Sequence, residues 1–135
     1  MKKILVIGGA YQGKTKWAEE NYPEYKIVSP EKLWKENVKG NLFDGIFLNG
    51  FHLILKQWME QGRDCKEAVA MLRKNSSWLI VSDEIGNGIV PIKREERQWR
   101  EYTGRALCQL AKDADEVYRI QCGIPVKIKG GGSRC

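Results

Sequence analysis

A glycine-rich segment near the N-terminus carries residue types that could bind phosphate. Residues 8–15, GGAYQGKT, fit the pattern G-x-x-x-x-G-K-[ST]. Gly8 and Gly13 allow backbone angles that a side chain would forbid, so successive N–H groups can point at one anion. Lys14 would add a positive charge at the β- and γ-phosphates, and the Thr15 hydroxyl could ligate Mg²⁺. The pattern predicts a P-loop that binds ATP or GTP with Mg²⁺ as cofactor. The predicted nucleotide-binding residues are Gly8, Gly9, Ala10, Tyr11, Gln12, Gly13, Lys14 and Thr15.

The residues on either side of this motif predict the elements that would position it. Before it, the apolar run Ile4–Ile7 is too short for a helix and rich in β-branched residues, which indicates a buried parallel strand. After it, Lys14–Asn21 predicts a short helix that ends before Pro23. The positive end of this helix would face the same anion as the loop. A glycine-rich turn with an incidental lysine is the structural alternative.

A second group of polar residues follows a later apolar run. Trp78–Val81 predicts a buried strand, and Ser82, Asp83 and Glu84 come at its end. Ligands of parallel sheets bind beyond the carboxyl ends of the strands, so these residues should share a rim with the phosphate loop. Phosphoryl transfer needs a carboxylate near Mg²⁺. We therefore predict Thr15, Glu84 and Asp83 as metal-binding residues and Glu84 as a catalytic acid; a helix or turn cap is the alternative for either acid.

The rest of the chain alternates predicted strands with predicted helices. This order predicts an α/β fold of the P-loop NTPase kind, with a mainly parallel sheet, helices on both faces and an antiparallel C-terminal edge hairpin. The further predicted strands are Tyr25–Val28, Asp44–Leu48, Glu116–Gln121 and Val126–Ile128. The further predicted helices begin at Pro30, Phe51, Cys65 and Lys93.

Length and composition limit the kind of protein this is. The chain has 135 residues, and we expect one domain over residues 1–129. Residues 130–135 carry no core side chain and are predicted to form a flexible tail. Hydrophobic residues make up 42% and charged residues 30%, which favours a globular chain over a disordered one. Because no apolar run could span a membrane and the N-terminus has a strand pattern rather than a signal peptide, we expect a cytoplasmic protein with no membrane partner.

The net charge of +6 is compatible with two kinds of polyanionic partner. Charge alone does not separate nucleotides from nucleic acids. No helix-turn-helix, RNP-like or zinc-finger pattern accompanies it, so we do not expect nucleic acid as the main partner. The four cysteines and one histidine lack metal-ligand spacing, which argues against a zinc site and indicates reduced thiols.

Three segments together resemble a known family. They are GGAYQGKT at 8–15, VSDEIGNGIVP at 81–91 and WREYTGRALCQLAKDADEVYRIQCGIPVKIK at 99–129. They resemble the adenosylcobinamide kinase/adenosylcobinamide-phosphate guanylyltransferase family of cobalamin biosynthesis. The resemblance implies transfer of the γ-phosphoryl group of ATP or GTP to the aminopropanol hydroxyl of a corrinoid, adenosylcobinamide. Such proteins often form oligomers, which leaves a homo-oligomer open for this chain.

The predicted long helix at residues 93–113 adds a basic face. Lys93, Arg97 and Arg100 follow at i, i+4 and i+7 and therefore share one side of the helix. Arginine can clamp phosphates or a transition state, although a solvated basic face is the alternative. Arg100 also matches a position of the resembled family, so we predict it as a clamp. The predicted catalytic residues are Lys14, Glu84 and Arg100.

Several residues depart from the pattern of that family. Its members carry histidines between the second and third strands, one of which takes up the guanylyl group, whereas residues 29–43 contain none. The single histidine, His52, follows the third predicted strand and is predicted to be a partly buried surface residue, so guanylyl transfer is not expected. Asn49 stands where the family usually has an acid, and Tyr11-Gln12 replaces Arg-Ser. The alternative function is a non-catalytic or regulatory nucleotide-binding protein that has lost the transferase parts.

Overall fold

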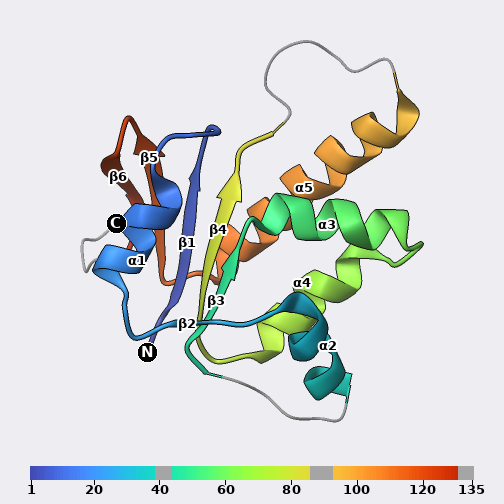
Figure 1. Cartoon of the computed structure of the whole chain (residues 1–135), viewed down its shortest axis with the longest axis horizontal. Coiled ribbons are helices and arrows are strands. Elements are labelled where there is room, and N and C mark those ends of the chain that lie inside the picture. The colour runs from blue at the N-terminus through green and yellow to red at the C-terminus, as the bar shows by residue number, and fades with distance from the viewer. Residues whose placement is uncertain (39–43, 86–92, 131–135) are drawn as a thin grey trace.

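The computed structural model describes residues 1–38, 44–85 and 93–130 and contains one six-stranded sheet. The strand order is β2-β3-β4-β1-β5-β6, and every neighbouring pair is parallel except the antiparallel pair β5–β6 (Figure 1). The strands are β1 Lys3–Gly8, β2 Lys26–Ile27, β3 Ile46–Asn49, β4 Trp78–Asp83, β5 Glu116–Gln121 and β6 Ile124–Lys129. The helices are α1 Lys14–Asn21, α2 Pro30–Val38, α3 Phe51–Glu60, α4 Cys65–Lys74 and α5 Arg94–Asp113. The predicted α/β fold with a C-terminal edge hairpin is confirmed.

Alternating apolar side chains of the strands build two cores, one on each face of the sheet. Successive residues of a strand point to opposite faces. Leu5 of β1 therefore packs in a cluster with side chains of α2, α3, α4 and α5, whereas Ile4 and Val6 pack with Ala18 of α1 on the other face. The helices thus cover both faces, as predicted. β1 lies between β4 and β5, which places the loop that follows it over the middle of the sheet.

The C-terminal hairpin is attached to that loop through its turn. Cys122 and Gly123 have φ angles of 52° and 75°, which corresponds to a two-residue turn of the kind that matches strand twist. The backbone N–H of Cys122 donates to the side-chain oxygen of Gln12 at 2.6 Å, and the N–H of Gly123 donates to the Gln12 carbonyl at 2.9 Å. The β5–β6 turn therefore supports the crest of the predicted phosphate loop.

Some predictions concern residues outside the part of the chain that the structure describes. These are the predicted flexible tail from residue 131 onward, residues 86–91 of the resembled motif at 81–91, and residues 39–43 of the histidine-free segment at 29–43. Among the described residues, Cys65 is a buried free thiol, and Cys108 and Cys122 are exposed free thiols. Among the described residues, no helix combines the length and apolar character needed to cross a membrane.

Candidate nucleotide site

The predicted phosphate loop connects the end of β1 to the first residue of α1. Gly8 approaches β5 closely: a Cβ at this position would lie 2.5 Å from the carbonyl oxygen of Ile120. Gly13 has a φ of +84°, a conformation that glycine adopts without strain. Tyr11 also has a positive φ, 59°, and its side chain is fully exposed at the crest of the loop. The two glycines that the motif predicted are thus required by local geometry.

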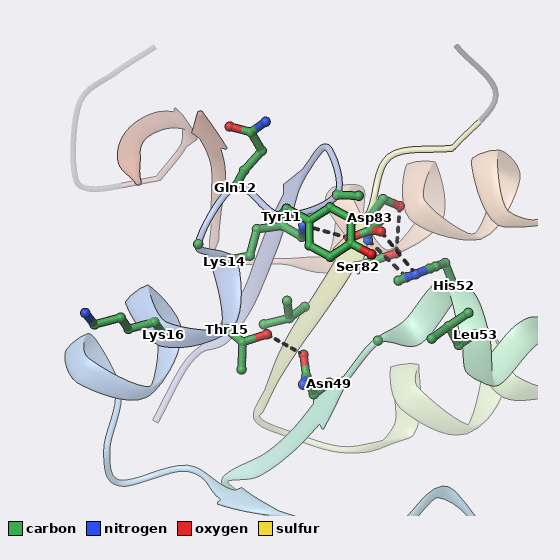
Figure 2. Close-up of a pocket in the computed structure, with 14 residues that line it drawn as sticks. Tyr11, Gln12, Lys14, Thr15, Lys16, Asn49, His52, Leu53, Ser82 and Asp83 are labelled. Carbon is green, nitrogen blue, oxygen red and sulfur yellow. Dashed lines mark hydrogen bonds and ion pairs between the residues drawn. The ribbon is translucent and has the colours of Figure 1, made fainter. Parts of the chain in front are cut away.

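Lys14 lies at the base of a pocket of about 390 Å³ formed by this loop and the ends of β3 and β4 (Figure 2). The residue is only 6% exposed, and its ammonium donates to the Gly9 carbonyl oxygen at 2.5 Å. Its second partner is the Asp83 carboxylate, with Nζ 2.7 Å from Oδ1. Asp83 is the register partner of Gly8 on the neighbouring strand, so the parallel pairing of β1 and β4 brings the acid to the lysine.

Thr15 and Asn49 form the oxygen-rich side of the same pocket. The Thr15 hydroxyl donates to the Asn49 side-chain oxygen at 2.9 Å (Figure 2). A hydroxyl, an amide oxygen and the nearby Asp83 carboxylate are ligand types that Mg²⁺ accepts, so these donors fit the ion. Among the described residues there is no group of three or more His, Cys, Asp or Glu side chains that could hold a metal. Bound Mg²⁺ would therefore need substrate phosphate oxygens and water as further ligands.

His52, in the first turn of α3, lines the pocket although the sequence did not predict it as a site residue. It is 8% exposed, so its placement as a partly buried surface residue is corrected. Its Nδ1 accepts the backbone N–H of Asp83 at 3.1 Å, and its Nε2 lies 3.4 Å from Asp83 Oδ2. Burial lowers the pKa of His52; Asp83 opposes this effect and the Lys14 charge adds to it. The ring is therefore neutral near pH 7, with its proton on Nε2 because Nδ1 is an acceptor.

Four other predicted residues do not line this pocket: Gly8, Gly9, Glu84 and Arg100. Glu84 forms a double hydrogen bond with Arg119, at 2.8 and 3.0 Å, and these side chains line a separate pocket of about 310 Å³ with Gly8, Gly9 and Gln121. Arg100 is not among the residues that line either pocket, and its guanidinium lies 3.7 Å from Glu96 of the same helix. The structure thus brings Lys14, Thr15 and Asp83 together, but not Glu84 or Arg100. The roles predicted for those two stay predictions.

Comparison with known proteins gives one family. The sequence model of the family described as cobinamide kinase / cobinamide phosphate guanyltransferase (CobU) matches residues 31–128. Two curated relatives are each 47% identical over 51 residues: the bifunctional adenosylcobalamin biosynthesis protein CobU of Salmonella typhimurium strain LT2 and that of Escherichia coli strain K12. These matches cover 38% of this chain and 28% of each relative.

Proposed function

The chain belongs to the cobinamide kinase / cobinamide phosphate guanyltransferase family, and from this premise we propose that it is a kinase. It would transfer the γ-phosphoryl group of ATP or GTP to adenosylcobinamide or a similar alcohol. The observation that carries the proposal is the buried ammonium of Lys14, which lies in one pocket with the Thr15 hydroxyl at the end of a phosphate-loop motif. A buried cation needs an anionic partner, which is Asp83 in this structure, and a polyphosphate beside Lys14 would supply further negative charge.

The proposed roles follow from the chemistry of phosphoryl transfer. The loop N–H groups and the positive end of α1 would hold the phosphates, and Lys14 would neutralise charge that develops on them. Thr15, held by Asn49, would bind Mg²⁺, which when bound neutralises charge on the phosphate oxygens. The acceptor oxygen forms a bond to the γ-phosphorus as the bond to the bridging oxygen breaks, and the acceptor proton passes to water. Catalysis in this reaction is mostly positioning and electrostatic stabilisation.

Guanylyl transfer is not part of the proposal. A nucleophilic imidazole needs a ring nitrogen that is open to the α-phosphorus. Both ring nitrogens of His52 face Asp83, and the residue is buried. This geometry argues against His52 as the acceptor of a guanylyl group, so the proposal is limited to the kinase reaction.

A non-catalytic nucleotide-binding protein is the second candidate, and Asn49 favours it. At the end of β3 the hydroxyl of Thr15 meets a neutral amide rather than a carboxylate. Mg²⁺ sites usually include at least one carboxylate, so the ion would depend more on Asp83 and on the phosphates. A protein of this kind would bind ATP or GTP without transferring phosphate.

Two measurements on the full chain separate these candidates. Calorimetry with ATP or GTP plus Mg²⁺ should detect binding, and transfer of the labelled γ-phosphoryl to adenosylcobinamide should follow. Lys14→Ala is expected to lower kcat about 100-fold or more, whereas Lys66→Ala, an exposed lysine on α4, should leave it unchanged. Binding without transfer would favour the second candidate, and absence of binding would refute both.

A further inference from the structure

His52 is a buried polar residue that the proposed reaction leaves without a role. It is the only histidine in the chain, and its ring nitrogens both face a single residue, Asp83. Figure 2 shows Lys14, Asp83 and His52 in sequence along the edge of the pocket, from the phosphate loop through the end of β4 to the start of α3. Three separate elements therefore meet at one carboxylate.

The two oxygens of the Asp83 carboxylate have different partners. Oδ1 lies 2.7 Å from the Lys14 ammonium, and Oδ2 lies 3.4 Å from His52 Nε2. The side chain of Asp83 is 24% exposed, whereas that of Lys14 is 6% exposed. The carboxylate thus neutralises a buried cation on one side and has an imidazole nitrogen beside it on the other. Without Asp83, the Gly9 carbonyl would be the remaining described partner of that cation.

His52 is itself held in place by its neighbours. The backbone N–H of Asp83 donates to Nδ1, which leaves the ring proton on Nε2, the nitrogen that lies 3.4 Å from Asp83 Oδ2. The Trp99 indole donates to the His52 carbonyl oxygen at 2.7 Å, and the two rings are 6.4 Å apart. The ring is thus held through Nδ1 and the backbone of His52 through its carbonyl. A side chain held in this way can keep a neighbouring carboxylate in one orientation, as second-sphere groups do at metal and catalytic sites.

We propose that Asp83 is the counter-ion that Lys14 exchanges for the triphosphate, and that His52 is a positioning residue that holds the carboxylate in place during that exchange. The inference rests on the proposed function for the identity of the ligand. A triphosphate carries more negative charge than one carboxylate, so it displaces Asp83 from the ammonium. Asp83 then stays beside His52 Nε2 and is partly open to water. Its orientation beside the phosphates is preserved for the transfer step.

The first test measures ATP binding by calorimetry without Mg²⁺, so that a metal-binding role cannot contribute. Asp83→Asn removes the competing charge and should tighten ATP binding about fivefold. Glu60→Gln, which removes an exposed charge on α3, should leave binding unchanged. Weaker or unchanged binding in Asp83→Asn would overturn the counter-ion role.

The second test separates kcat from KM in transfer from ATP to adenosylcobinamide. His52→Phe keeps a ring but removes the donor, so kcat should fall about 10- to 100-fold with KM for ATP nearly unchanged. His52→Gln, which retains an N–H donor, should recover most of the loss, and Gln57→Ala on the exposed side of α3 serves as control. Equal rates in His52→Phe and wild type would overturn the positioning role, as would failure of His52→Gln to recover any rate.

The third test needs no variant of His52, so it holds even if such variants misfold. A single histidine gives one set of imidazole ¹⁵N signals in the full chain. These should show the Nε2–H tautomer, and the Nε2–H resonance should shift when ATP draws Lys14 away from Asp83, but not in Asp83→Asn. A wild-type protein that binds no nucleotide would refute the proposed function together with this inference. One that binds and transfers while the His52 signals stay still would refute this inference alone.

Discussion

At the scale of single residues, the Thr15–Asn49 contact is the least usual feature of the site. A hydroxyl that ligates Mg²⁺ is commonly supported by a carboxylate, whereas here it donates to an amide oxygen at 2.9 Å. In the proposed Mg²⁺ site the neutral amide of Asn49 would contribute no charge to the metal. The hydroxyl of Thr15 should therefore matter more for Mg²⁺ affinity than it would beside an acid.

The matching prediction concerns the Mg²⁺ requirement. Thr15→Val removes the hydroxyl at nearly constant volume and should raise the Mg²⁺ concentration for half-maximal nucleotide binding about 10-fold or more. Thr15→Ser keeps the hydroxyl and should stay close to wild type. Titration of Mg²⁺ at fixed ATP measures both, and an unchanged midpoint in Thr15→Val would remove Thr15 from the metal site.

At the scale of elements, the phosphate loop depends on close packing between the end of β1 and β5. The carbonyl oxygen of Ile120 would lie 2.5 Å from a Cβ added at Gly8, and this contact is to backbone, which cannot rotate away. At Gly9 the nearest atoms to such a Cβ belong to the Gln12 side chain, at 3.7 Å and beyond. A side chain at Gly8 would therefore clash with the backbone of β5, whereas one at Gly9 would make only ordinary contacts.

Gly8→Ala should lower the free energy of unfolding by about 1–3 kcal/mol, because overpacking pushes β1 and β5 apart. Gly9→Ala meets only ordinary contacts and should change stability by less than about 0.5 kcal/mol. Urea denaturation of both variants measures the difference. Equal stability of the two variants would contradict the close approach of β1 to β5.

At the scale of the whole molecule, a buried glutamate connects distant parts of the chain. Glu116 at the start of β5 is 7% exposed and accepts hydrogen bonds from Lys2, from Tyr22 beyond α1 and from Tyr118. Burial acts to raise the pKa of Glu116, but the hydrogen bonds from Lys2, Tyr118 and Tyr22 together outweigh burial and lower it below 4.5. The carboxylate form is therefore favoured more strongly in the folded protein than in the unfolded chain.

This shift predicts how stability depends on pH. Since the folded pKa is the lower one, Glu116 stabilises the fold above its unfolded pKa, and that contribution is lost as pH falls through the folded value. Glu116→Gln should cost about 1–3 kcal/mol at pH 7, and its difference from wild type should shrink below about pH 4.5. Glu20→Gln on the exposed side of α1 is the control, with little effect expected at either pH. Thermal or urea unfolding across this range checks the sign.

The sequence alone determined the local elements and their order. The apolar run before Gly8, the glycines of the loop and the segment Lys14–Asn21 each carry a short-range signal, because strand burial, backbone freedom and helix capping act over a few residues. The same signals predicted α1 to its exact bounds and β5 likewise. They also indicated that the residues following β1 and β4 lie at the same edge of the sheet, because parallel strands end at a common carboxyl edge.

Only the tertiary structure decided which side chains meet in the pocket. Asp83 and Glu84 are adjacent, and successive residues at a strand end point to opposite faces, so composition could not tell which one reaches Lys14. The position of His52 depends on how α3 packs against the end of β4, which involves residues 31 positions apart. Contacts between residues so far apart in the sequence depend on the register of the sheet and on how the helix packs against it. No local pattern in the sequence encodes them.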